Sequence, residues 1–349
     1  RLHDLGVRYD EIAVLYRNNA LSRLFEEAMI KEGMPYIIYG GISFYERKEV
    51  KDALAYIRLV IDPYQDFYLK RIVNVPKRSI GLVSVQKLEL KARELGTSMF
   101  EAIEHADLTP SSRQSLIAFK QLILDMQEKF GEMENLEQIM PYVMGKTGYI
   151  DMLRAENDEI ADDRIDNLKE LQNVFTRGDL YYEGSFVEKL TQQLDQIALY
   201  TDQDQEIDDH DRVRLSTYHQ VKGLEFRVVF MVVMEEGIFP SDRSLMNPSE
   251  LEEERRIAYV GITRAKERLY LSYADQRMVY GSIRYTYPSR FIQESRLRFE
   301  EPKYEGISEG GGSHLLKVGD KVDHTAFGLG VVVRIDDDIA TIAFAMPHG

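Results

Sequence analysis

Cysteine is absent from this sequence, which excludes disulfide bonds and cysteine-based metal sites and is typical of a reducing cytoplasm. No apolar run approaches the ~20 residues needed to span a bilayer. Residues 1–9 contain no apolar core of a signal peptide. We therefore expect a cytoplasmic protein that has no membrane partner.

An excess of positive charge is also lacking, with 44 lysines and arginines against 59 aspartates and glutamates. The formal net charge of −15 argues against a protein that binds nucleic acid over its whole surface. A local basic groove is still allowed, because salt limits the reach of exposed charges to about 10 Å. The 349 residues are 44% hydrophobic and 30% charged, which predicts a globular protein of two or three domains.

A phosphate-binding loop is missing as well. Gly145-Lys146-Thr147 supplies the end of the pattern G-x-x-x-x-G-K-[ST], but Met140 stands where the first glycine belongs. The preceding residues have a helical pattern, so no nest of backbone amides would surround a phosphate there. We predict that this stretch is not a nucleotide loop.

Strands and helices alternate at the start of the chain. The apolar run at 12–16 predicts a buried strand, and the apolar residues of 21–29 fall on one face of a helix. Residues 36–39 predict a second strand and 48–60 a second helix. This alternation predicts a parallel α/β sheet.

A helical stretch interrupts this pattern, because no strand is predicted between Arg71 and Tyr200. Its predicted helices cover 76–90, 115–130, 136–144, 165–175 and 186–199. The α/β pattern then returns, with strands at 213–218, 228–233 and 269–273 and a helix at 251–262. The sequence therefore predicts an all-helical domain inserted into an α/β domain.

The last part of the chain has a third pattern. Residues 296–313 include three consecutive glycines and predict a flexible linker. Short strands are expected beyond it, at 321–323, 330–335 and 339–344. Residues 314–349 therefore predict a small, partial β-barrel.

Residues 217–226, T-Y-H-Q-V-K-G-L-E-F, join two of the predicted strands. Polar groups at the ends of strands are where open α/β sheets usually bind ligands. An ordinary surface loop also carries polar residues. The stretch by itself leaves both interpretations open.

Two arginines are candidates for phosphate chemistry. Arg17 directly follows a predicted strand and Arg264 directly follows a predicted helix. The rigid, always charged guanidinium suits the charge that develops on a transferred phosphoryl group. The alternative for each is a surface ion pair. Within the helix before Arg264, residues 252–256 (E-E-E-R-R) predict a solvated face, and the expected core residues are Ile257, Tyr259 and Val260.

The motifs taken together resemble the carboxy-terminal half of a superfamily 1 DNA helicase of the UvrD/PcrA type. Any one of them is weak, but their order along the chain is specific. The segments are I-A-V-L-Y-R-N-N-A-L-S-R (12–23), G-G-I-S-F-Y-E-R-K-E-V-K-D-A-L-A-Y-I-R (40–58), T-Y-H-Q-V-K-G-L-E-F (217–226), M-E-E-G-I-F-P-S (234–241) and E-E-E-R-R-I-A-Y-V-G-I-T-R-A (252–265). The resemblance covers residues 1–295.

The resemblance implies a fold and a domain order. Residues 1–70 and 205–295 correspond to the second RecA-like motor domain, which is interrupted by the helical accessory domain at 71–204. The tail at 314–349 resembles an SH3/Tudor-like barrel. The family's Walker A lysine, magnesium ligands and adenine-reading glutamine belong to an amino-terminal RecA-like half. We expect this chain alone to be inactive.

The resemblance also assigns nucleotide contacts residue by residue. Tyr16 matches the tyrosine that stacks on adenine, and Arg17 matches an arginine finger for the γ-phosphate. Glu225 corresponds to the carboxylate that holds the ribose, and Arg264 matches the second arginine finger. The implied ligands are ATP and Mg²⁺.

DNA contacts follow in the same way. Thr217 and His219 match strand-end residues that touch single-stranded DNA, and Tyr280 matches the aromatic pin that stacks on the first base pair of the duplex. Residues 76–81 resemble a helix–hairpin–helix turn that grips duplex backbone. Its matching positions are Lys77, Arg78, Ile80 and Gly81, but the first glycine of the motif is replaced by Ser79.

The implied function is an ATP-dependent 3′–5′ DNA helicase or translocase in repair or replication, in the bacterial cytoplasm and at the nucleoid. Its partners are single-stranded DNA, the single-strand/duplex junction and the amino-terminal half. One alternative is a DNA-binding fragment without catalytic activity. Another is an adaptor whose Tudor-like tail docks on RNA polymerase.

Overall fold

A computed structural model describes residues 2–156, 159–203, 211–279, 282–295, 321–324, 328–336 and 339–344. The chain divides into two compact units, Arg1–Leu297 and Arg298–Gly349, and each is described by itself. None of the helices in the described ranges combines the length and apolar character that a bilayer crossing requires.

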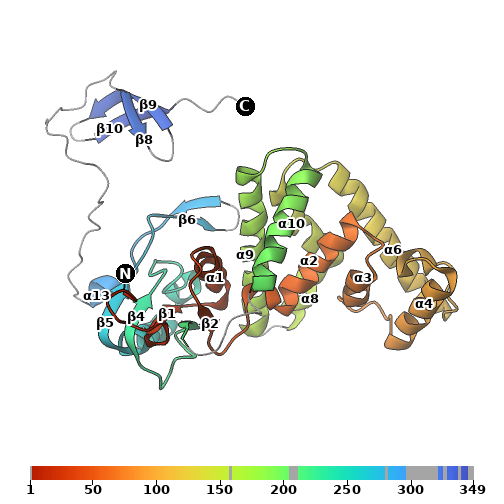
Figure 1. The fold of residues 1–349 in the computed structure, drawn as a ribbon, viewed down its shortest axis with the longest axis horizontal. Coiled ribbons are helices and arrows are strands. Elements are labelled where there is room, and N and C mark those ends of the chain that lie inside the picture. The colour runs from red at the N-terminus through yellow and green to blue at the C-terminus, as the bar shows by residue number, and fades with distance from the viewer. Residues whose placement is uncertain are drawn as a thin grey trace. The chain divides into compact units, whose positions relative to one another are not determined.

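The first unit contains a parallel α/β sheet, as the sequence predicted (Figure 1). It has five strands, in the order β2-β3-β1-β4-β5. Every neighbouring pair of strands in it is parallel. The strands are β1 (Ile12–Tyr16), β2 (Tyr36–Ile38), β3 (Val213–Thr217), β4 (Phe226–Met231) and β5 (Ala265–Leu271).

The central strand β1 is buried along its whole length because both faces of the sheet are covered. Alternate residues of a strand point to opposite faces. Ala13 and Leu15 pack with residues of α12 (Pro248–Ile262) and α13 (Arg290–Glu294). Ile12, Val14 and Tyr16 pack with residues of α1 (Ser22–Lys31) on the other face. This explains the uninterrupted apolar run that identified the strand.

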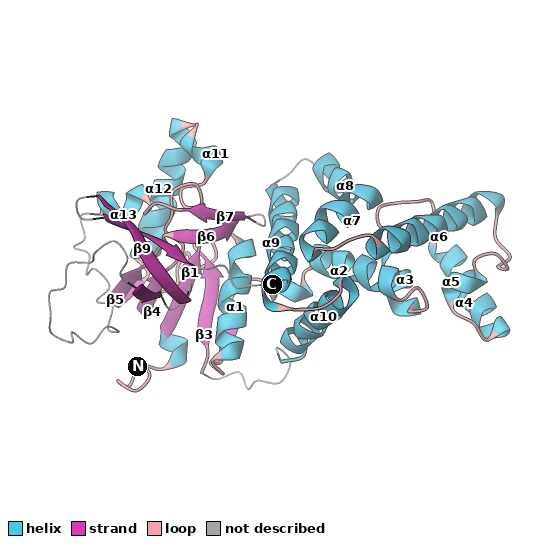
Figure 2. Cartoon of the chain, turned by 90° about the horizontal axis from the view of Figure 1, so that it is seen from above, coloured by secondary structure: helices cyan, strands magenta, loops and turns pink. Residues whose placement is uncertain are grey.

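Helices occupy the chain between β2 and β3, which are neighbours in the sheet although residues 39–212 separate them. Figure 2 shows these helices gathered apart from the strands of the sheet. They share one apolar core, which extends from Phe44 to Ile197. The helices are α2 (Lys48–Ile61), α3 (Asp66–Ile72), α4 (Leu82–Leu95), α5 (Met99–Ala102), α6 (Pro110–Gly131), α7 (Ile139–Thr147), α8 (Tyr149–Glu156), α9 (Glu159–Tyr181) and α10 (Phe186–Gln203).

The structure decides two predictions about this part of the chain. Gly145-Lys146-Thr147 forms the last turn of α7, so the Gly-Lys-Thr sequence is helical and not a phosphate loop. The helix predicted at 76–90 is wrong at its start, because α4 begins at Leu82. Residues 73–81 instead form a turn whose backbone amides at Arg78 and Ile80 donate to the Oδ1 of Asn74, at 2.7 and 3.2 Å.

Ser79 in this turn has a φ of 60°, in the left-handed region that favours glycine. Because its side chain is exposed, Ser79→Gly removes the backbone strain without opening a cavity. We expect the variant to gain about 0.5–1 kcal/mol in free energy of unfolding. Urea denaturation measures the change, with Ser79→Ala as the matched control that keeps a Cβ. A gain for Ser79→Ala equal to that for Ser79→Gly would contradict this account.

Several short elements of the first unit have no counterpart in the predictions. They are α3, α5, α8, α11 (Asp242–Leu245), α13 and the antiparallel pair β6 (Gln276–Val279) and β7 (Ser282–Tyr285). In the second unit, β8 (Lys321–His324), β9 (Gly328–Asp336) and β10 (Ile339–Phe344) form an antiparallel sheet in the order β10-β9-β8. The strands fall where the sequence placed them, and their assignment to a Tudor-like module stays a prediction.

Candidate functional site

The carboxyl ends of β1 and β3 bring the first group of predicted residues together. Tyr16 pairs in register with Thr217 at these ends, and the amide of Tyr218 donates to the carbonyl of Tyr16 at 3.2 Å. Arg17 and His219 therefore emerge at the same edge of the sheet. Parallel strands end at one edge, which is why residues so far apart in the chain meet here.

Arg17 is bound at this edge by Glu254 of α12. Its Nε lies 2.8 and 3.0 Å from the two carboxylate oxygens, and its Nη2 lies 2.6 Å from Oε1. The side chain of Glu254 is 3% exposed and that of Arg17 is 26% exposed. A bidentate pair of this kind fixes the plane of the guanidinium. Its charge is consequently neutralised by a buried carboxylate.

The prediction that residues 252–256 form a solvated face is wrong at Glu254, and the placing of Tyr259 in the core is also wrong. Glu254, Ile257, Ala258 and Gly261 are the buried residues of α12, whereas Tyr259 is 69% exposed. These buried positions follow the i, i+3, i+4, i+7 spacing of one helix face. That spacing was readable in the sequence, and would have placed Glu254 on the inner side.

Gly261 allows this helix to approach the sheet closely. A Cβ at this position would lie 2.8 Å from both the Cε of Met231 and the Cδ1 of Tyr218. The helix is thereby packed against residue 218 of the polar segment 217–226, whose ring stacks on Phe239 at 4.7 Å. The segment is anchored in the core and is not an ordinary surface loop.

His219 lies beside the Arg17–Glu254 pair, with an exposed side chain. Partial desolvation and the positive charge of Arg17 lower its pKa below the usual value, although Glu254 opposes this change. The imidazole is therefore neutral at pH 7 and can both donate and accept a hydrogen bond.

Glu225 and Arg264 lie at the opposite edge of the sheet. Glu225 directly precedes β4 and Arg264 directly precedes β5, and the amide of Phe226 donates to the carbonyl of Arg264 at 2.8 Å. The carboxylate of Glu225 is 59% exposed and faces the ammonium of Lys266 at 3.8 Å. The predicted ribose and phosphate contacts thus share one edge.

The guanidinium of Arg264 is held by neutral acceptors. Its Nε donates to the carbonyl of Val260 at 3.0 Å, its Nη1 to the carbonyl of Leu224 at 2.9 Å and its Nη2 to the hydroxyl of Thr263 at 3.0 Å. Within the described ranges no carboxylate forms an ion pair with it. Arg264 is therefore oriented but keeps its positive charge for an external anion.

Arg17 and Arg264 are not brought together. The pairing of Ile12 with Val228 and of Phe226 with Ala265 puts them at opposite ends of the strands. Their separation along the strand direction is on the order of 20 Å at the usual rise per residue. A joint contact of both arginines with one γ-phosphate stays a prediction, and it requires a change in side-chain positions.

Tyr16 and Thr217 are both buried. The ring of Tyr16 is 1% exposed and stacks on Phe25 with centroids 6.1 Å apart. Burial raises the pKa of its hydroxyl. Thr217 is 7% exposed. Neither side chain presents a surface to adenine or DNA in this conformation, so these two roles also stay predictions.

The residues predicted to grip duplex DNA divide into two kinds. Lys77 and Gly81 are exposed in the turn between α3 and α4, whereas Ile80 is 1% exposed. Arg78 points inward, because its Nη2 donates to the hydroxyl of Tyr56 at 2.7 Å and its Nη1 to the carbonyl of Pro76 at 3.1 Å. Arg78 therefore holds the shape of the turn, which leaves Lys77 and the backbone for a partner.

Tyr280 lies outside the described residues, between β6 and β7. Strand β6 is held by Glu235, which is fully buried and accepts from Arg277 at 2.7 and 2.9 Å and from the amide of Ala274 at 3.0 Å. The neighbouring Glu236 pairs with Arg290 at 2.9 Å. The two glutamates of the 234–241 motif are thus structural anchors, a role that the sequence did not reveal. Among the described residues there is no group of three or more histidine and carboxylate side chains that could hold a metal ion.

The fold and these motifs define an open α/β domain whose polar motifs lie at the strand ends of a parallel five-stranded sheet. The model of the UvrD-like helicase C-terminal domain matches residues 2–276, and the chain belongs to this family. It is 38% identical over 391 aligned residues to an ATP-dependent DNA helicase PcrA of Bacillus subtilis, with 100% of this chain and 52% of the relative covered. The PcrA helicase of Leuconostoc citreum is 35% identical, and the match covers 96% of this chain and 51% of the relative. The PcrA helicase of Staphylococcus aureus is 37% identical, and the match covers 97% of this chain and 50% of the relative. The chain spans about half the length of these curated relatives.

The Arg17–Glu254 pair leads to a prediction about the free energy of unfolding. Arg17→Ala leaves a buried carboxylate unpaired and is expected to lower the free energy of unfolding by about 1–3 kcal/mol. Adding Glu254→Gln removes the stranded charge and should recover at least half of that loss. Urea denaturation of both variants checks this. A double variant no more stable than Arg17→Ala would show that the pair contributes no specific electrostatic stabilisation.

Proposed function

We propose that this chain is the carboxy-terminal portion of an ATP-dependent 3′–5′ DNA helicase or translocase. Residues 1–70 and 205–295 form its second RecA-like motor domain, and 71–204 form an inserted helical accessory domain. Residues 314–349 belong to a partial SH3/Tudor-like barrel after a linker at 296–313. The family match over residues 2–276 and the parallel sheet support this assignment.

The observation that carries the proposal is the uncompensated charge of Arg264. Three neutral acceptors hold its guanidinium in place, and the exposed Glu225 lies at the same edge of the sheet. An oriented cation stabilises the charge that develops on a transferred phosphoryl group, and it needs no reorganisation at the moment of reaction. A carboxylate is suited to accept hydrogen bonds from ribose hydroxyls. We assign the nucleotide to this edge.

Single-stranded DNA belongs to the other edge, where His219 is exposed. A neutral imidazole can hydrogen-bond to phosphate oxygens or bases, and Lys222 in the same segment is an exposed cation. Residues 219–225 connect the two edges. The segment would therefore transmit the state of the nucleotide to the grip on DNA.

ATP would be bound together with Mg²⁺ between this domain and an amino-terminal RecA-like half, which would supply the Walker A lysine and the magnesium ligands. Closure of the two motor domains brings Arg264 to the phosphates. The partners are single-stranded DNA and the single-strand/duplex junction, which Tyr280 would meet as the pin. We assign the protein to the bacterial cytoplasm and nucleoid, in repair or replication.

Complementation tests this function. DNA-stimulated ATP hydrolysis is measured with this chain, with a separately supplied amino-terminal RecA-like half, and with both together. We expect hydrolysis above the sum of the parts only in the mixture. DNA binding by this chain with no restored hydrolysis would favour the DNA-binding fragment instead.

A further inference from the structure

The segment that contains β6 and β7 differs in charge from the rest of the chain. Residues 276–290 contain three arginines and no aspartate or glutamate, in a protein whose net charge is −15. They also contain three tyrosines. Basic residues interleaved with aromatic rings are the usual composition of a surface that binds single-stranded nucleic acid.

Two of these tyrosines stand two residues apart, Tyr285 at the end of β7 and Tyr287 just beyond it. Tyr285 pairs in register with Gln276, and the next amide, that of Thr286, donates to the carbonyl of Asp275 at 3.0 Å. The carbonyl of Tyr287 accepts from the amide of Glu236 at 3.0 Å. These backbone hydrogen bonds continue the pairing beyond the last residue of β7. Since side chains alternate along a paired backbone, we infer that the rings of residues 285 and 287 project from one face.

Both rings are unusually exposed for aromatic side chains. Tyr285 is 76% exposed and Tyr287 is 71% exposed. None of the ring-stacking contacts between described residues involves either of them. Their backbone is nevertheless held rigidly, since Glu235 binds Arg277 on the paired strand. Rigid support with free rings is what a stacking site requires.

The spacing of the two side chains fits a nucleobase. Residues i and i+2 of a strand are about 6.6–6.8 Å apart. This is about twice the spacing of ~3.4 Å between successive nucleotides of one DNA strand. One base can therefore enter between the rings of Tyr285 and Tyr287 and stack on both of them.

We propose that Tyr285 and Tyr287 form a base-stacking site for single-stranded nucleic acid on the outer face of the β6–β7 pair. The ligand class rests on the proposed function, but the site is separate from His219 and from the predicted pin at Tyr280. Stacking is tolerant of sequence because every base has a π-face. The site would hold one base of a separated strand while the rest of the protein moves.

The absence of tryptophan makes a direct test possible. Tyr285→Trp introduces a single tryptophan, whose fluorescence should fall about twofold when an oligothymidylate binds, because a stacked base quenches an indole. The matched control is Tyr181→Trp, on α9, where the tyrosine is 78% exposed. We expect no quenching of that tryptophan by the same oligonucleotide.

Affinity gives a second measurement, made by anisotropy of a labelled oligonucleotide. Tyr285→Ala and Tyr287→Ala should each weaken binding about tenfold, whereas Tyr285→Phe should keep the wild-type affinity. Removal of a ring leaves the phosphate contacts unchanged, so the slope of log K against log salt should stay the same. A change of slope would point to a phosphate contact instead of stacking.

The outcomes separate this inference from the proposed function. One outcome is that the chain binds the oligonucleotide, but the fluorescence of the Tyr285→Trp variant stays constant and the alanine variants bind normally. This outcome overturns the stacking site, while DNA binding by the chain stands. If the unmodified chain does not bind single-stranded DNA at all, the stacking site is overturned, whereas the proposed function is decided by the complementation. Quenching together with a tenfold loss in the alanine variants supports the site even if ATP hydrolysis cannot be restored.

Discussion

Arg264→Ala is expected to lower DNA-stimulated ATP hydrolysis by about 10³-fold when the chain is combined with an amino-terminal RecA-like half. The guanidinium of Arg264 is oriented by the carbonyls of Val260 and Leu224 and by the hydroxyl of Thr263. All three acceptors are neutral, so under the proposed function the full positive charge would act on the phosphoryl group. Its removal takes away stabilisation of the transition state more than binding of ATP.

The measurement is therefore a comparison of kcat with KM for ATP. We expect the loss in kcat, with KM changed by no more than about threefold. Arg256→Ala is the matched control, because Arg256 lies on the helix that precedes Arg264 and is 74% exposed, and its one ion pair among the described residues is with Glu253. Equal hydrolysis by the Arg264→Ala and wild-type mixtures would remove Arg264 from the catalytic site. An equal loss for Arg256→Ala would show damage to the helix instead.

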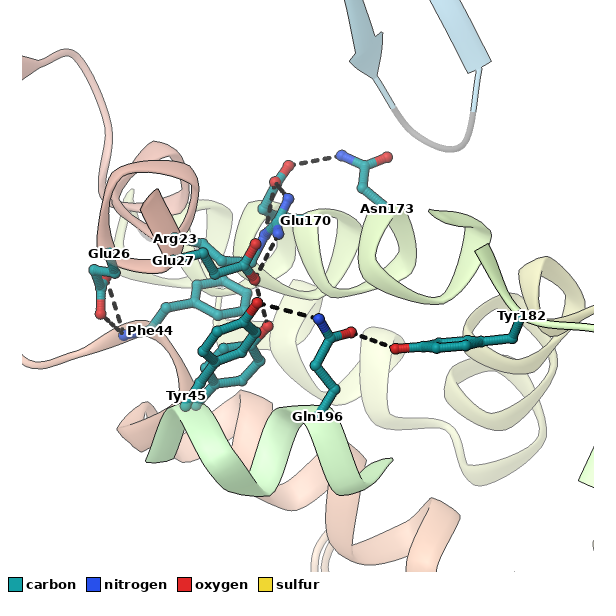
Figure 3. A network of polar contacts seen from close by, with 10 residues as sticks. Arg23, Glu26, Glu27, Phe44, Tyr45, Glu170, Asn173, Tyr182 and Gln196 are labelled. Carbon is teal, nitrogen blue, oxygen red and sulfur yellow. Dashed lines mark hydrogen bonds and ion pairs between the residues drawn. The ribbon is translucent and has the colours of Figure 1, made fainter. Parts of the chain in front are cut away.

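Arg23→Ala is expected to give the largest loss of stability, about 3–5 kcal/mol in the free energy of unfolding. Arg23 of α1 is 1% exposed, and it joins the sheet side of the first unit to helix α9. It donates to Glu27 at 2.8 Å and through its Nε to Glu170 at 2.9 Å, and its Nη2 also pairs with Glu170 (Figure 3). Burial alone would lower the pKa of Arg23, but the two carboxylates raise it.

The network around this arginine explains the size of the effect. Glu27 also accepts from the hydroxyl of Tyr45 at 2.7 Å, and Glu170 accepts from Asn173 at 2.6 Å, so neither carboxylate can turn out to solvent without breaking another bond. Figure 3 shows Gln196 and Tyr182 beside the same cluster, joined by a hydrogen bond of 2.5 Å. Truncation of Arg23 would leave two unpaired negative charges that are only 19% and 14% exposed, where partial desolvation makes them costly.

Thermal unfolding followed by circular dichroism measures this prediction. A loss of 3–5 kcal/mol corresponds to a fall in Tm of roughly 5–8 °C for a unit the size of Arg1–Leu297. The control replaces all three charges, Arg23→Met with Glu27→Gln and Glu170→Gln, and it should recover most of the stability because no unpaired charge is left. If the triple variant is as unstable as Arg23→Ala, then lost packing, and not stranded charge, is the cause.

The strands of the sheet could be predicted because burial on both faces produces apolar runs. The run I-A-V-L-Y matches β1 at both ends. The turn at 73–81 could not be predicted in this way, since it depends on the amide contacts with Asn74 and on the left-handed backbone of Ser79. Local periodicity carries no information on such contacts.

The candidate site was predicted in part. The sequence placed Arg17 directly after a strand, and His219 and Glu225 between two strands, where the structure has them. It placed Arg264 directly after a helix, but did not predict that Arg264 also directly precedes β5. The parallel sheet decides which of these residues share an edge. In such a sheet, residues that follow a strand lie at one edge and residues that precede a strand lie at the opposite edge. The inner position of Glu254 was visible as helical spacing, but its pairing with Arg17 depends on how α12 crosses the sheet.

The sequence by itself determined the family, the alternation of strands and helices, and the absence of a phosphate loop at 140–147. These depend on residue order and on local periods, which are properties of the chain. The tertiary structure decided that Glu254 neutralises Arg17 while Arg264 keeps its charge, and that two tyrosines of β7 and its extension stay exposed. Such differences arise from contacts between residues far apart in the chain, because burial and pairing depend on what the fold places beside each side chain.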